Sequence, residues 1–204
     1  MKYNDYVIEQ FFQQFYVEKV RRHFQLTSNP ETALAGDIGL TMFWHGIADF
    51  YGRLHYFGRN NFPYVSTGTA RKSYEHFIGE FFPKNWSKYA SLLYSVFRNG
   101  MTHQISPKHA GISWYDNNLL FLNKKDHNVA PAITEIPSLN LKVYGELVCK
   151  GFDEFMNRII LNKEPLIAEY IYNNIIKTSS DLGDKKVLDA EIRKLSTTNF
   201  GPNP

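Results

Sequence analysis

The residues whose types and spacing could do chemistry lie in the stretch "FRNGMTHQISPKH", residues 97 to 109. Asn99 directly follows Arg98, and His103 comes five residues after the arginine. Arginine presents a permanent, planar, forked charge that suits phosphate, whereas histidine titrates near neutral pH and can transfer a proton. The stretch therefore predicts chemistry at a phosphate group.

Metal-independent cleavage of RNA requires these two functions together. A 2′-hydroxyl must lose its proton, a pentavalent phosphate must be stabilised and a 5′-oxygen must leave, and histidine and arginine can serve as acid/base and electrostatic clamp. A well-placed general base contributes only about 10²- to 10⁴-fold, so His103 alone would not make a fast nuclease. We expect Arg98, Asn99 and a second copy of the site to supply the rest.

Helix geometry restricts how these side chains can cooperate. Serines step along the preceding helix on the side opposite its apolar stripe, which predicts that Arg98 emerges on a polar surface. In an unbroken helix, Arg98 and His103 would differ by about 140° in azimuth and about 7.5 Å in rise, so they would diverge. Asn99 and Gly100 tolerate left-handed backbone, and they predict that the helix stops there.

These residues resemble the HEPN superfamily, the higher eukaryotes and prokaryotes nucleotide-binding domains. Residues 98 to 103 match its R-x4-6-H motif with a polar residue after the arginine, and "LLYSVFRNGMTHQISPK" is similar to an R-N/C-G-L-x-H-x-x-x-P-K segment of prokaryotic HEPN-like proteins. The resemblance implies a helical bundle that forms a homodimer with the motif at the interface. It often implies a metal-independent endoribonuclease of a toxin–antitoxin or phage-defence system.

By this resemblance, Arg98 would contact phosphate, Asn99 would orient the site and His103 would be the acid/base. Lys108 and His109 extend the basic rim and are further candidates for binding RNA or phosphate, or else they are solvent-facing loop residues. HEPN toxins paired with a nucleotidyltransferase antitoxin commonly carry a tyrosine two residues after the histidine, and Ile105 stands here instead. Control by modification at that position is therefore not expected, although an antitoxin or other regulatory protein is a possible partner.

Two other interpretations of the motif are open. The chain could be a non-catalytic HEPN-like module that binds nucleotide, RNA or a protein partner, with Arg98 as the anion anchor. It could also be a structural homo-oligomer in which arginine and histidine only satisfy a helix end.

His45 and Asp49, four residues apart on a predicted long helix, form a second candidate, either an orienting histidine–carboxylate pair or a buried, satisfied polar pair. A third ligand with suitable spacing is missing from the sequence. We therefore predict neither a metal site nor a cofactor.

The elements that must position the motif form an all-α, HEPN-like bundle of five or six helices with a small β-hairpin. Apolar residues at helical spacing predict helices at about 4–26, 40–58 and 74–81, another from Trp86 with Asn85 as its cap, and two more at about 144–159 and 167–175. The stretch 111–123 predicts a hairpin that turns at Asp116-Asn117-Asn118. We expect one domain over 1–180 and a polar C-terminal tail over 181–204.

Composition fits this organisation. The 204 residues are 43% hydrophobic, which is ordinary for one globular domain. The net charge is only +3, so RNA would be held by a local patch rather than by a global field. The single cysteine, Cys149, excludes an internal disulfide, and neither a signal-peptide pattern nor a run of 18 apolar residues is found. These features predict a cytoplasmic protein with no membrane partner.

Overall fold

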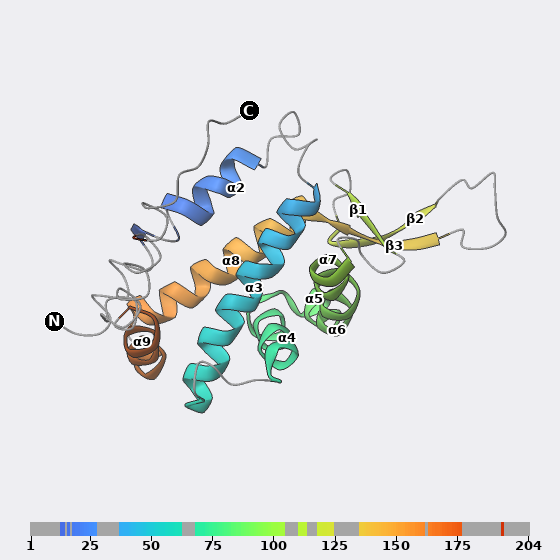
Figure 1. Cartoon of the computed structure of the whole chain (residues 1–204). Coiled ribbons are helices and arrows are strands. Elements are labelled where there is room, and N and C mark those ends of the chain that lie inside the picture. Colours follow the sequence, from blue (N-terminus) through green and yellow to red (C-terminus); the bar gives the residue numbers. More distant parts are fainter. Residues whose placement is uncertain are drawn as a thin grey trace.

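The computed structural model of the chain describes residues 13–14, 16, 18–27, 37–62, 68–104, 110–113, 118–124, 135–161, 163–176 and 193. The described part is mostly helical, which confirms the predicted all-α class (Figure 1). The helices are α2 (Arg22–Thr27), α3 (Asp37–Asn60), α4 (Ala70–Phe81), α5 (Lys84–Ser87), α6 (Ala90–Leu92), the π-helix η3 (Leu93–Arg98), α7 (Asn99–Gln104), α8 (Leu141–Ile160), α9 (Pro165–Ile171) and the π-helix η4 (Tyr172–Ile176). The predicted tail lies outside the described residues except for Arg193.

Helix α3 runs through the middle of the molecule, and α4, α8 and α9 pack against it (Figure 1). These helices can pack against α3 because its buried residues recur at steps of three and four, as the apolar pattern predicts. They include Leu40, Trp44, Ile47, Tyr51 and Leu54. The helix is confirmed, and it extends beyond the predicted range at both ends.

Aromatic side chains fill the space between α3, α4 and α8. The rings of Tyr51 and Phe152 stack with centroids 3.9 Å apart, and Phe77 lies beside them with its centroid 6.2 Å from that of Tyr51. Such rings bury a large apolar area per residue. Gly52 allows α4 to approach closely, because a Cβ atom there would overlap the Ser73 carbonyl.

The segment after α4 departs from the prediction. Asn85 is not the cap of a helix, because α5 begins at Lys84 with Pro83 as its N-cap. The Pro83 carbonyl accepts hydrogen bonds from the amides of Trp86 and Ser87. A backbone group, rather than the Asn85 side chain, therefore satisfies amides in the first turn of the helix. The predicted single helix is also interrupted at Tyr89, whose ψ of 8° is not helical.

The predicted hairpin is wrong in its pairing. Strands β1 (Gly111–Ser113) and β2 (Leu120–Lys124) lie where it was expected, but each pairs with a third strand, β3 (Glu135–Asn140). Strand β3 is parallel to β1 and antiparallel to β2. A strand between the two satisfies hydrogen-bonding groups along both of its edges and buries Leu139, which a two-stranded hairpin would not achieve.

Within the described ranges, no helix combines the length and the apolar character that a bilayer crossing requires.

Candidate functional site

The motif lies on a continuous helical segment made of η3 and α7. Leu93, Phe97 and Met101 are fully buried and anchor this segment to the core. Arg98 is the last residue of η3, and Asn99 and His103 belong to α7. The three predicted catalytic residues therefore lie on one short helical segment.

The predicted helix stop at Asn99 and Gly100 is wrong. Asn99 has φ −69° and ψ −38°, which is helical, and its amide donates to the carbonyls of Tyr94 and Val96. Positive φ angles among the described residues occur at Asn61 and Gly68, not in the motif. Burial of Met101, one turn after the buried Phe97, favours continuation of the helix over the turn preference of Asn-Gly.

Arg98 does not lie on an open polar surface as predicted, because its side chain turns inward to α3. Its Nη2 donates to Asp49 Oδ2 at 2.6 Å, and its Nη1 donates to Asn99 Oδ1 at 3.1 Å. The guanidinium carbon also lies 5.3 Å from the centre of the Tyr94 ring. The side chains of Arg98 and Asp49 are only 18% and 15% exposed, so the ion pair is largely buried.

His103 is exposed on α7. Because α7 is α-helical from Asn99 onward, the azimuth between Arg98 and His103 remains about 140°, so the two side chains leave the segment on different sides. The other predicted ligand-binding residues, Lys108 and His109, lie outside the described residues.

The predicted pairing of His45 with Asp49 is replaced by two separate contacts. Nδ1 of His45 lies 2.8 Å from the Tyr74 hydroxyl and 2.9 Å from the Tyr144 hydroxyl, and the two hydroxyls are 2.7 Å apart. Burial, with a contribution from the Arg98 charge, lowers the pKa of His45 to about 3. The imidazole is therefore neutral, which removes a competing positive charge from the inner side of the Arg98–Asp49 pair.

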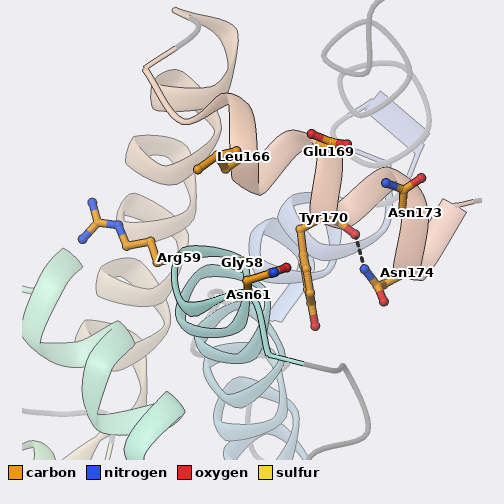
Figure 2. Close-up of a pocket in the computed structure, with 8 residues that line it drawn as sticks. All are labelled: Gly58, Arg59, Asn61, Leu166, Glu169, Tyr170, Asn173 and Asn174. Carbon is orange, nitrogen blue, oxygen red and sulfur yellow. Dashed lines mark hydrogen bonds between the residues drawn. The ribbon is translucent and has the colours of Figure 1, made fainter.

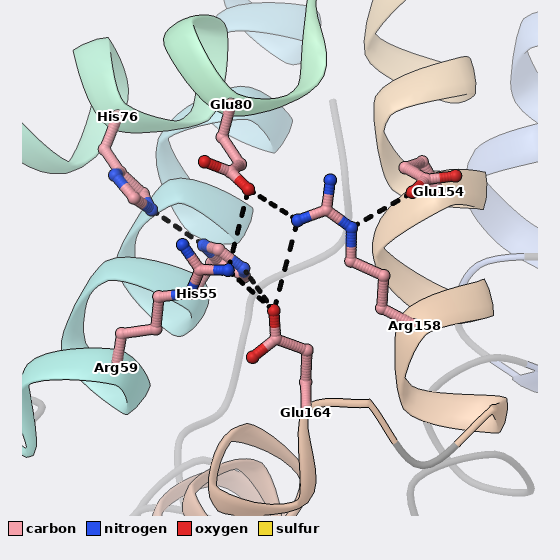
Figure 3. A network of polar contacts seen from close by, with 7 residues as sticks. All are labelled: His55, Arg59, His76, Glu80, Glu154, Arg158 and Glu164. Carbon is pink, nitrogen blue, oxygen red and sulfur yellow. Dashed lines mark hydrogen bonds and ion pairs between the residues drawn. The ribbon is translucent and has the colours of Figure 1, made fainter.

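A second polar network joins α3, α4, α8 and the start of α9 (Figure 3). Nδ1 of His55 lies 2.7 Å from Nε2 of His76. The shortest ion pairs beside these rings join Arg59 to Glu164 at 2.7 Å and Arg158 to Glu80 at 2.5 Å. Burial lowers the pKa of His55 to about 2, with smaller contributions from His76 and the two arginines. Because the network joins four elements, its polar contacts indicate a role in holding the fold together rather than in binding a ligand.

A pocket of about 330 Å³ opens between the end of α3 and the segment formed by α9 and η4 (Figure 2). Asn61, Glu169, Tyr170 and Asn174 are among its lining residues, and the Arg59 side chain points away from them. Gly58, also in the lining, follows Asp49 by nine residues, which is about 180° around α3. The pocket is therefore on the other side of α3 from Arg98.

Neither metal ligation nor the cysteine adds a site within the described part of the chain. The described residues hold no group of three or more histidine, cysteine, aspartate or glutamate side chains arranged to bind a metal ion. Cys149 is buried, and burial raises the pKa of its thiol to about 11, so the thiol is a packing group rather than a nucleophile.

Comparison of the chain with protein-family models, with curated proteins and with solved structures finds no match.

The sequence pattern alone missed Asp49 as the partner of Arg98. The two residues are 49 positions apart, and no local spacing rule connects them. Asp49 was instead assigned to His45, four residues earlier on the same helix, and His45 bonds to tyrosine hydroxyls.

Proposed function

We propose that the chain is a cytoplasmic, HEPN-like, metal-independent endoribonuclease that cleaves RNA by attack of the 2′-hydroxyl, in a toxin–antitoxin or phage-defence setting. One observation carries this proposal. Arg98, Asn99 and His103 share one helical segment, on which the guanidinium is held in a fixed orientation and the imidazole is exposed.

The proposed reaction assigns each residue a step. His103 accepts the proton of the 2′-hydroxyl or donates one to the leaving oxygen, and Arg98 stabilises the charge of the pentavalent phosphate. The 2′-oxygen forms a bond to phosphorus while the bond to the 5′-oxygen breaks. The products are a 2′,3′-cyclic phosphate and a free 5′-hydroxyl.

The separation of Arg98 and His103 around the helix supports a site made by two chains. Side chains about 140° apart point to different sides of one segment, so a two-fold axis beside α7 could bring His103 of one protomer toward Arg98 of the other. We therefore include a homodimer, with the motif at its interface, in the proposal.

A non-catalytic HEPN-like module that binds nucleotide, RNA or a protein partner is the alternative. The Asp49 carboxylate favours it, because this group already compensates the charge of Arg98 and leaves less net charge to attract RNA. Such a module would show salt-sensitive RNA binding that weakens in Arg98→Ala, without turnover.

The deciding experiment incubates the purified protein with mixed cellular RNA in EDTA, beside His103→Ala. His23→Ala is the matched control, because His23 is also exposed but lies on α2, away from α7 (Figure 1). Cyclic-phosphate ends from the wild type and from His23→Ala, but not from His103→Ala, would support the nuclease. Cleavage that needs a metal ion, or that survives His103→Ala, would contradict it.

A further inference from the structure

Asp49 contacts the group that the proposed function assigns to the phosphate. Its Oδ2 accepts a 2.6 Å hydrogen bond from Arg98 Nη2, while Asn99 Oδ1 accepts from Nη1 and the Tyr94 ring lies against the guanidinium. Three surrounding groups thus limit rotation of one planar cation. A guanidinium fixed in this way is already oriented before a ligand arrives.

Stability alone gives a weak reason for this ion pair. Removing two charges from water costs much of what their attraction returns, so a largely buried pair adds little to folding compared with apolar side chains of similar size. Asp49 also engages Arg98 through one oxygen in the contact described above, and Oδ1 is buried without a hydrogen-bond partner among the described residues. A carboxylate placed only for stability would be expected to have both oxygens bonded.

The part of α3 next to Asp49 is fixed by buried polar contacts to two other helices. His45, one turn earlier on α3, is neutral and is held by the hydroxyls of Tyr74 and Tyr144. These groups come from α3, α4 and α8 and are fully buried or nearly so. The turn of α3 that carries Asp49 therefore adjoins a packed layer that cannot easily rearrange.

We propose that Asp49 is the positioning residue for phosphodiester binding by Arg98: its carboxylate fixes the orientation in which the guanidinium meets the scissile phosphate. This inference rests on the proposed function. Asp49 itself touches neither the substrate nor the reacting atoms.

The expected signature separates the chemical step from binding. Asp49→Asn keeps the size of the side chain but removes its charge, so Arg98 loses its orientation and the site gains one unit of positive charge. RNA should therefore bind as tightly as to the wild type or more tightly. The single-turnover cleavage rate should fall about 10- to 100-fold, as expected for a misplaced charge stabiliser. Asp49→Glu, which keeps the charge, should recover part of the rate.

The experiment measures single-turnover rate, RNA affinity and thermal unfolding for five proteins. These are the wild type, Asp49→Asn, Asp49→Glu, Arg98→Ala and the double variant Asp49→Asn/Arg98→Ala. If Asp49 acts through Arg98, its substitution should change nothing further once the arginine is gone. Glu80→Gln is the matched control, because Glu80 is also a partly buried carboxylate paired with an arginine, Arg158, but away from the motif. It should lower thermal stability without changing the cleavage rate.

The outcomes separate the two proposals. An unchanged rate in Asp49→Asn, or an effect of equal size with and without Arg98, would overturn the positioning role and leave the nuclease intact. A wild-type protein that does not cleave RNA would remove both.

Discussion

Two histidines of α3 are buried in a neutral state. His45 is held by tyrosine hydroxyls, and His55 pairs with His76 beside the ion pair of Arg59 and Glu164. Burial is the main cause of the lowered pKa in both, from the ordinary 6.5 to about 3 for His45 and to about 2 for His55. Below about pH 6.5, each of these histidines is therefore unprotonated in the folded protein and protonated in the unfolded chain.

This difference predicts a dependence of stability on pH. Below about pH 6.5 the unfolded chain takes up protons that the folded protein excludes. The free energy of unfolding should therefore be level above that pH and should fall by about 1.4 kcal/mol per pH unit for each histidine below it. Urea unfolding between about pH 7.5 and about pH 5.5, above the range where carboxylates titrate, measures the slope.

His55→Gln is the variant that isolates one contribution. It removes one titrating group from the pair with His76. The fall in the free energy of unfolding should therefore become smaller by about 1.4 kcal/mol per pH unit. Equal slopes for this variant and the wild type would show that His55 is protonated in the folded state.

At the scale of elements, the contact of α3 with α4 depends on a missing side chain. Gly52→Ala should lower the free energy of unfolding by about 1–3 kcal/mol, because the new methyl group would overlap the Ser73 carbonyl and force the helices apart. Gly46→Ala is the control, because a Cβ atom at Gly46 meets no atom within 4 Å. That change should stabilise α3 by about 0.5–1 kcal/mol through helix propensity. Chemical denaturation of both variants tests the prediction, and equal effects would contradict it.

The elements differ in how far the sequence predicts them. Helices α3, α4 and α8 follow from apolar periodicity, since each is long enough for its pattern to repeat and each buries that stripe. Strand β3 was missed because Pro137 lies inside it, and proline normally argues against a paired strand. The proline is tolerated here because β1 pairs only with residues 138 to 140, so Pro137 lies beyond the end of β1.

The sequence proposes the residue types of the candidate site but does not give its geometry. Arg98 and His103 are singled out by their chemistry and by the resemblance to the HEPN motif, whereas the inward turn of Arg98 depends on a carboxylate from a distant element. The π-helical turn that ends at Arg98 was also missed, because its register depends on how Leu93 and Phe97 pack.

At the scale of the whole molecule, the proposed dimer predicts complementation between inactive variants. If Arg98 of one protomer works with His103 of the other, a dimer of one Arg98→Ala chain and one His103→Ala chain keeps one intact site. Coexpressed in equal amounts, the two variants should regain about a quarter of wild-type cleavage, because half of the dimers are mixed and each has one site. Cleavage assays of the purified mixture test this, and no recovery in mixed dimers would mean that each chain uses its own pair.

Helix α3 is covered on nearly every side, and this limits how its sequence can change. From Thr41 to Gly58, only Met42 and Gly46 are exposed. Asp49 of the candidate site therefore stands one turn from His45 and less than one turn from Gly52, both of which hold neighbouring helices. A substitution that retunes the site from α3 must also fit the core, so new specificities are more readily acquired through α7, where His103 is exposed, than through the helix that supports Arg98.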